Sequence, residues 1–209
     1  MRRFERKTCP DVLLEAYAKG NDKPKWVVWG EKYQANRRKN EGFIFQWPQV
    51  RNQKLNQLLL PDLKVQTDSH CSYCDGFSVK SGERTIDHFK PKSEFPLEVC
   101  SWENLYLACT HCQSAEVKGD KYDERLLRPD EEAYQFEEYF YYDYTTHQIK
   151  VLQYISEEKQ LRASITMEIL AFNNLTMIEC RRQMFDGFND KPDYPNELIG
   201  YRFMFPEIS

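Results

Sequence analysis

Four of the seven cysteines form two C-x-x-C pairs, Cys71 with Cys74 and Cys109 with Cys112, and 34 residues separate the pairs. Two residues between thiols let a tight turn aim both sulfurs at one ion, and two such turns complete a tetrahedral zinc site with no open position. A closed site of this kind is structural and contributes directly to the free energy of folding. The spacing therefore predicts structural zinc rather than disulfides or redox chemistry.

The segment between the pairs carries side chains suited to phosphodiester hydrolysis. Asp87 is a hard oxygen donor of the type that Mg²⁺ prefers, and the adjacent His88 can deprotonate a water. Neighbours on a strand alternate sides, so these two side chains need not touch, although the end of a strand can still bring both near one point. Asn104 can lock loop geometry, and Gln113 is expected at a helix start, where backbone N–H groups favour an anion.

Two histidines next to the cysteine pairs and the three remaining cysteines are weaker candidates for metal ligands. His70 and His111 adjoin the zinc ligands and can substitute for one of them, but a full set of four thiols disfavours that. The three lone cysteines are expected to be core thiols: Cys9, Cys100 and Cys180.

Lysines near the expected base are candidates to bind nucleic acid through phosphate. Lys90 and Lys92 directly follow His88, and Lys118 lies shortly after the second cysteine pair. The cluster at 37–39, Arg-Arg-Lys, is more often a solvated helix face.

The elements expected to position these residues follow from periodicity and from Gly and Pro breaks. A helix from Asp11 ends at Gly20 and a third helix stops at Pro61. The expected segments are helices at 11–20, 32–40, 50–60 and 113–119, strands at 84–89 and 104–108, a hairpin at 134–153 with its turn at 143–147, and helices within 157–186 interrupted at 173–174.

Composition describes a folded chain with an uneven charge. The 209 residues are 41% hydrophobic and 30% charged, with a net charge of -4. Residues 1–54 carry a net charge of +7, residues 55–119 a net charge of -3 and residues 120–209 a net charge of -8.

No apolar run is long enough to cross a bilayer and the N-terminus lacks an apolar signal core, so the expected location is the cytoplasm, with no membrane partner. The phosphate-binding G-x-x-x-x-G-K, the dinucleotide-binding G-x-G-x-x-G and the nucleophile elbow G-x-S-x-G are all missing, which excludes the common NTPases, Rossmann enzymes and serine hydrolases.

Three runs of sequence together resemble the zinc-bearing form of the HNH endonuclease family: TIDHFKPKS at 85–93, WENLYLACTHC at 102–112 and KGDK at 118–121. The resemblance implies the ββα-metal fold, two strands and a helix around a catalytic Mg²⁺ or Mn²⁺. It implies that His88 is the general base, that Asp87 ligates the divalent ion and that Asn104 orients the base-bearing loop. The residue after the second cysteine pair, here Gln113, would be the remaining ligand of the catalytic metal.

That last position departs from the family pattern, which has Asn or His there and a Lys about three residues on. Gln113 offers the same amide oxygen on a longer arm, and the Lys-Gly pair arrives two residues late, at 118–119. His111 is the fallback ligand. The departure leaves open a second interpretation, in which the chain is a catalytically impaired, zinc-stabilised binding or adaptor module.

The helical lead with Pro-Lys-Trp at 24–26, the zinc HNH core, the hairpin after Arg-Pro-Asp at 128–130 and the helical run at 166–181 together show a looser similarity over most of the chain. They resemble the HNH subunit of Septu-type anti-phage defence systems, including the version attached to some retrons. This resemblance implies a nucleic acid substrate and an ABC/SMC-like ATPase subunit in a hetero-oligomer, with a retron reverse transcriptase and its DNA as further partners in the retron version. The aromatic and acidic run at 134–144 is then either a half-buried hairpin or a surface for that partner.

These observations predict an α+β fold: a ββα-metal HNH core stapled by a four-cysteine zinc site, flanked by N-terminal helices and by a C-terminal hairpin plus helices. The expected divisions are a basic, mostly helical lead at 1–67, the zinc-bearing nuclease core at 68–126, and an acidic region at 127–209 that packs on the core or on a partner.

Overall fold

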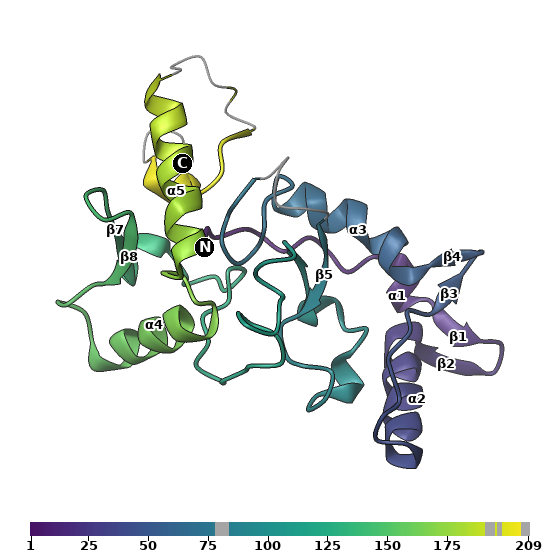
Figure 1. The fold of residues 1–209 in the computed structure, drawn as a ribbon. Helices are drawn as coiled ribbons and strands as arrows, with labels where there is room; N and C mark the ends of the chain where they lie inside the picture. Colours follow the sequence, from purple (N-terminus) through teal and green to yellow (C-terminus); the bar gives the residue numbers. More distant parts are fainter. Residues whose placement is uncertain (78–83, 191–194, 196–197, 206–209) are drawn as a thin grey trace.

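A computed structural model describes residues 1–77, 84–190, 195 and 198–205. In this part of the chain, helices alternate with four separate antiparallel strand pairs, β1–β2, β3–β4, β5–β6 and β7–β8 (Figure 1). The mixture confirms the predicted α+β class. The elements are α1 (Asp11–Leu14), β1 (Ala16–Ala18), β2 (Asn21–Pro24), α2 (Lys25–Lys39), β3 (Gln49–Val50), β4 (Gln53–Lys54), α3 (Leu55–Gln66), β5 (Thr85–His88), β6 (Leu105–Ala108), β7 (Phe140–Asp143), β8 (Gln148–Val151), α4 (Glu157–Ile169) and α5 (Leu175–Asp190), with short 3-10 turns that include η1 (Pro96–Glu98) and η2 (Trp102–Asn104).

The strand pair β5–β6 lies at the centre and separates two hydrophobic clusters. Leu105 and Leu107 of β6 belong to a cluster with the N-terminal helices, whereas Tyr106 and Ala108 belong to a cluster with the C-terminal elements. Because side chains alternate along a strand, each strand gives one face to each cluster. Both strands were predicted, within one residue at each end.

The N-terminal helices differ from their predicted bounds. The first ends after Leu14 and gives way to the β1–β2 hairpin, whose turn uses Gly20 at a positive φ of 83°. The third continues through Pro61 instead of stopping there. Leu59 and Leu63, on either side of that proline, are both fully buried, and this packing outweighs the loss of one helical hydrogen bond.

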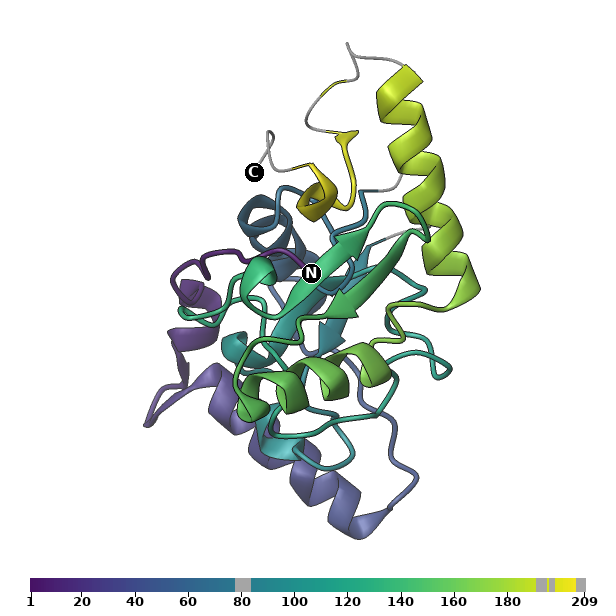
Figure 2. The same ribbon diagram turned by 90° about the vertical axis from the view of Figure 1, so that its left-hand side faces the viewer.

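The C-terminal elements match their predicted pattern. The β7–β8 hairpin turns between Asp143 and Gln148, and α4 and α5 are separated at the predicted asparagine pair. Asn174 caps α5 by accepting a hydrogen bond from the Met177 amide at 2.9 Å. Figure 2 shows this hairpin in front of the central strands, with α4 and α5 beside it.

The segment after the second cysteine pair is not a regular helix. Residues 113–119 form consecutive turns with mixed bonding, such as Ser114 N–H to the His111 carbonyl at 3.1 Å and Gln113 N–H to the Cys109 carbonyl at 3.2 Å. The predicted helix at this place, and the helix N-terminus expected to attract an anion at Gln113, are therefore wrong.

Among the described residues, no helix is both long and apolar enough to cross a membrane.

Candidate active site and metal centre

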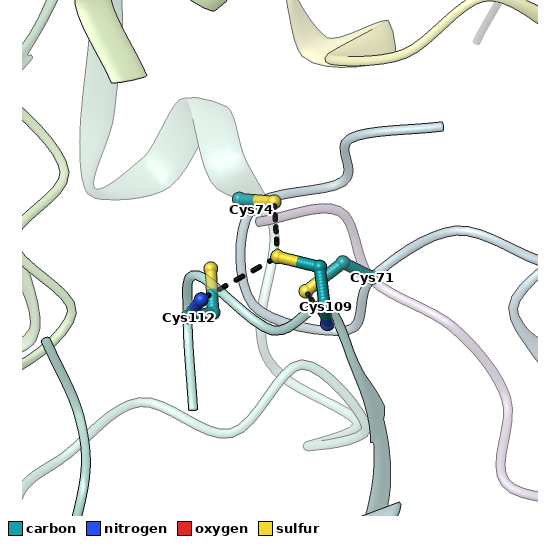
Figure 3. Close-up of side chains that lie close together, drawn as sticks. All are labelled: Cys71, Cys74, Cys109 and Cys112. Carbon is teal, nitrogen blue, oxygen red and sulfur yellow. Dashed lines mark hydrogen bonds between the residues drawn. The ribbon is translucent and has the colours of Figure 1, made fainter. Parts of the chain in front are cut away.

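The two C-x-x-C turns bring their four sulfur atoms together (Figure 3). All four Sγ atoms lie within 4.8 Å of one another, and Cys74 Sγ is 4.0 Å from Cys109 Sγ. Zinc–sulfur bonds of about 2.3 Å in a tetrahedron place sulfurs about 3.8 Å apart. The geometry therefore fits a four-thiolate metal site, and the cluster can hold an ion such as zinc.

Backbone amides around the cluster point at the sulfurs. Gly76 N–H lies 3.3 Å from Cys74 Sγ, and the Cys109 and Cys112 amides each lie 3.4 Å from a sulfur of the cluster. Such N–H donors favour the thiolate form. Without a cation the sulfurs oppose one another: their mutual hydrogen bonds raise the pKa of Cys74 and of Cys112 and lower that of Cys71. A bound cation resolves this conflict.

The two neighbouring histidines are occupied elsewhere. Both ring nitrogens of His70 face backbone carbonyls, at 2.7 and 2.8 Å, and His111 Nε2 accepts a hydrogen bond from the Asn174 amide at 2.9 Å. The lone cysteines lie outside the cluster. Cys100 is fully buried, and Cys9 and Cys180 are half-buried.

Asp87 lies on the face of β5 that looks toward the cysteine cluster. It pairs across the strands with Tyr106, and its Oδ2 accepts a hydrogen bond from Tyr73 Oη at 2.7 Å. Lys118 Nζ forms an ion pair with the same oxygen at 3.0 Å. Burial raises the pKa of Asp87, against the lowering effect of Lys118 and of Tyr73.

His88 lies on the opposite face of β5, beside Leu105. Its Nε2 donates a hydrogen bond to the Val99 carbonyl at 2.9 Å. The Trp47 ring lies nearly parallel to the imidazole, and the Phe45 ring meets it edge-on. Only 6% of His88 is exposed, and burial, followed by the charge of Lys92, lowers its pKa to about 3.

The other ring nitrogen of His88 is Nδ1. Nδ1 has no hydrogen bond among the described residues. A carbonyl oxygen only accepts, so Nε2 carries the ring proton and Nδ1 the lone pair. The arrangement presents a neutral base with a fixed tautomer.

Asn104 holds the loop that follows His88. Its Oδ1 accepts from the Lys90 amide at 2.7 Å, and its Nδ2 donates to the carbonyls of Lys90 and Glu98 at 3.1 and 3.2 Å. Glu98 immediately precedes Val99, so one buried amide side chain fixes both the chain leaving His88 and the chain that supplies its carbonyl partner.

The Gln113 side chain contacts the face of β5 on which Asp87 lies. The Gln113 side chain bonds to the hydroxyl of Thr85, at 2.9 Å through Oε1 and 2.6 Å through Nε2. Thr85 is two residues before Asp87, so their side chains share a face about 6.6 Å apart along the strand. The structure brings Gln113 to the neighbourhood of Asp87, without a contact between them, and His88 to the other face.

The three lysines occupy different environments. Lys90 is half-buried and pairs with Glu98 at 2.9 Å, and Lys92 is half-buried with no ion pair among the described residues. Lys118 is completely buried, and its ammonium group bonds both Asp87 and the His88 carbonyl, the latter at 2.7 Å. The expectation that Lys118 contacts phosphate does not agree with this burial.

Three residues that contact Asp87 or His88 were not predicted from the sequence. Tyr73 lies inside the first C-x-x-C turn, and its position between two metal ligands was the available signal. Trp47 and Phe45 come from outside the cysteine-bounded segment, and no spacing in the sequence connects them to His88.

Comparison with known proteins agrees with this geometry. The family model described as HNH endonuclease matches residues 71–118, which span both cysteine pairs, Asp87, His88 and Lys118. Residues 71–118 are thus similar to the HNH endonuclease family.

A relative extends the likeness beyond the HNH domain. The Septu protein PtuB of Bacillus thuringiensis is 25% identical over 139 residues, which cover 66% of this chain and 44% of the relative. The chain thus matches less than half the length of that protein.

Proposed function

We propose that this protein is a metal-dependent HNH endonuclease that hydrolyses phosphodiester bonds of DNA or RNA, with His88 as its general base. The observation that carries the proposal is the state of the His88 imidazole: Nε2 is fixed on the Val99 carbonyl, and Nδ1 has no hydrogen bond among the described residues. This tautomer can take a proton from a water as the water attacks phosphorus.

The low pKa of His88 has a consequence for this role. With a pKa of about 3, the His88 imidazole is neutral in the unliganded protein, and it is a weak base. A phosphodiester placed beside the ring brings a negative charge, which favours the imidazolium and raises the pKa.

Asp87, together with Gln113, is the proposed ligand set for a divalent cation such as Mg²⁺ or Mn²⁺. Asp87 Oδ2 is taken by Tyr73 and Lys118, whereas Oδ1 has no hydrogen bond among the described residues. One carboxylate oxygen and a nearby amide fit an ion that usually takes few protein ligands and completes its shell with water and phosphate. When bound, such an ion neutralises charge on the phosphate and the leaving oxygen. Tyr73 and Lys118 hold the carboxylate in place for it.

Two lysines are proposed to steer the nucleic acid strand. Lys92 has no ion pair among the described residues and its charge acts on His88, and Lys90 follows His88 on the loop that Asn104 secures. Asn104 is proposed to position the base through this loop. Lys118 is proposed to act on Asp87 and not on phosphate.

The direct test is cleavage of DNA and RNA by the purified protein with Mg²⁺ or Mn²⁺. His88→Ala should abolish cutting and leave bound zinc unchanged, because the cysteine cluster does not involve His88. His147→Ala is the matched control: His147 bonds Tyr142 in the C-terminal hairpin, outside the HNH domain, and its loss should leave cutting intact. Cutting that survives His88→Ala would reject the proposed base.

A second candidate function is a zinc-stabilised binding or adaptor module that has lost catalysis. Two contacts favour it: Lys118 neutralises Asp87, and the Gln113 amide is engaged by Thr85. Under this alternative the protein binds its partner and zinc normally but cuts no substrate, even with partner and nucleotide present.

The likeness to a Septu protein supports a place in an anti-phage defence complex, where this chain would be the effector nuclease. An ABC/SMC-like ATPase subunit is the proposed partner, and a retron reverse transcriptase with its DNA a further one. Co-purification from the native host tests this: the ATPase should travel with the chain, and recovery of the chain alone would count against a stable complex.

A further inference from the structure

The base His88 is enclosed by two aromatic rings that come from outside the HNH domain. Trp47 lies against the imidazole face, with ring centroids 5.5 Å apart and planes 18° apart. Phe45 meets the imidazole at 5.8 Å and 87°. Both precede residue 71, where the match to the HNH family begins.

The segment that carries these rings is secured at both ends. At its start, the Asn40 carbonyl accepts a hydrogen bond from Phe43 N–H at 2.9 Å, and at its end the Pro48 carbonyl accepts from Leu55 N–H at 2.8 Å. Its side chains alternate: Phe43, Phe45 and Trp47 pack on the N-terminal cluster, whereas Ile44 between them is 79% exposed. The segment therefore presents one aromatic face inward in a defined register.

The rings also brace one another. Phe45 contacts Trp47 at 5.1 Å and 75°, and Tyr33 of α2 contacts Phe45 at 5.2 Å and 78°. Edge-to-face pairs of this kind have preferred geometries, so the position of Trp47 is transmitted from α2 through Phe45. The imidazole thus contacts the stacked Trp47 ring, the perpendicular Phe45 ring and, through Nε2, the Val99 carbonyl.

We propose that Trp47 and Phe45 are positioning residues for His88: they hold the imidazole so that Nδ1, the nitrogen without a hydrogen bond among the described residues, stays in the orientation that substrate requires. This inference rests on the proposed nuclease function. Without the two rings, the Val99 hydrogen bond alone leaves the imidazole free to pivot about that contact. A base displaced by about 1 Å can lose on the order of 100-fold in rate.

The test compares Trp47→Ala, Trp47→Phe and Phe43→Ala by kcat and KM on a substrate that the wild-type protein cuts. Phe43→Ala is the matched control, because Phe43 lies on the same segment and contacts Tyr33 but not His88. Trp47→Ala should lower kcat about 10- to 100-fold with KM nearly unchanged, Trp47→Phe should recover most of it, and Phe43→Ala should stay near the wild type. Equal losses in Trp47→Ala and Phe43→Ala would show a general packing effect, and a raised KM with unchanged kcat would show that Trp47 stacks on a nucleobase; either result overturns the proposal.

An NMR measurement separates failure of this inference from failure of the nuclease proposal. The His88 Hε1 proton should carry a ring-current shift from Trp47 that disappears in Trp47→Ala and persists in Phe43→Ala. If that shift is absent in the wild type, Trp47 does not stack on His88, and the positioning proposal is wrong whether or not the protein cuts a substrate. If the shift is present and no substrate is cut, the proposed function fails, and the positioning role for that reaction fails with it.

Discussion

At the scale of residues, the alternation of a strand decides where the chemistry lies. Asp87 and His88 are neighbours, yet one faces Tyr106 and the cysteine cluster and the other faces Leu105 and the N-terminal helices. Because the two side chains leave opposite faces of the strand, one phosphodiester can approach both only at the end of β5, where His88 is the last residue. The pair of residue types could be read from the sequence, but the aromatic enclosure of His88 could not.

The first residue-scale prediction concerns the charge of His88. Its pKa in the folded protein, about 3, is below the usual 6.5, so the imidazole should stay neutral from neutral pH down to about pH 5. Because the unfolded chain binds this proton first, His88 lowers stability as pH falls from about 6.5 toward 3. Nitrogen chemical shifts of His88 test this, and a midpoint near pH 6.5 would contradict the burial that the structure shows.

The second concerns the buried ion pair of Lys118 and Asp87. Lys118→Met removes the ammonium group that pairs with Asp87 and leaves a largely buried carboxylate without that partner, which should destabilise the fold by about 3 kcal/mol. Lys23→Met is the control, since Lys23 pairs with Glu31 at the surface and its loss should change little. Urea unfolding measures both, and equal midpoints for the two variants would show that the buried pair is not structural.

At the scale of elements, contact between α2 and η1 connects the N-terminal helices to His88. A Cβ at Gly30 would lie 2.2 Å from the Leu97 carbonyl oxygen, so only glycine permits this approach. Leu97 belongs to η1, and Val99, the partner of His88 Nε2, follows two residues later. The helix thereby sets the position of the loop that orients the imidazole.

Gly30→Ala should therefore push η1 away, destabilise the protein by about 1–3 kcal/mol and lower the cleavage rate. Gly187→Ala in α5 is the contrast: nothing lies within 4 Å of the added carbon, so the better helix former should stabilise by about 0.5–1 kcal/mol. Thermal and urea unfolding of both variants distinguish the two effects, and a neutral Gly30→Ala would refute the close approach.

Sequence patterns predicted elements well where local signals agree with packing. The β5–β6 strands and the C-terminal hairpin follow from alternation, and the break at 173–174 from its asparagines. Sequence patterns gave wrong helix bounds where tertiary contacts determine the backbone conformation. Because leucines on both sides of Pro61 are buried, α3 continues through this proline. The segment at 113–119 is not helical, because it turns around the second cysteine pair, where the Lys118 amide donates to the Cys112 carbonyl at 3.2 Å.

At the scale of the whole molecule, the cysteine cluster anchors the larger of the two cores. All four thiols belong to the hydrophobic cluster that includes the C-terminal hairpin and helices. The C-terminal residues also clasp the first cysteine turn: Tyr201 N–H donates to the Asp75 carbonyl at 2.7 Å, and the buried Arg202 pairs with the Asp75 carboxylate at 2.6 Å. The aromatic run at 134–144 contributes Tyr134, Phe140 and Tyr142 to this core, which favours a structural role over a partner surface.

Metal removal should therefore disrupt more than a local loop. A strong chelator, or Cys74→Ser, is expected to lower the unfolding temperature sharply and to loosen the C-terminal core, because structural zinc sites carry folding free energy. Cys9→Ser, a change to a half-buried thiol outside the cluster, should retain the metal and the stability of the parent. Unchanged thermal stability of the metal-free protein would refute the structural site.

The most direct test of the central claim is hydrolysis of bis(p-nitrophenyl) phosphate, an activated phosphodiester that needs neither strand recognition nor a partner subunit. With Mn²⁺ present, the wild-type protein should release p-nitrophenol, and His88→Ala with its zinc content intact should release none above background. Equal rates for the two proteins would contradict the account, because they would show that the imidazole enclosed on β5 is not the base.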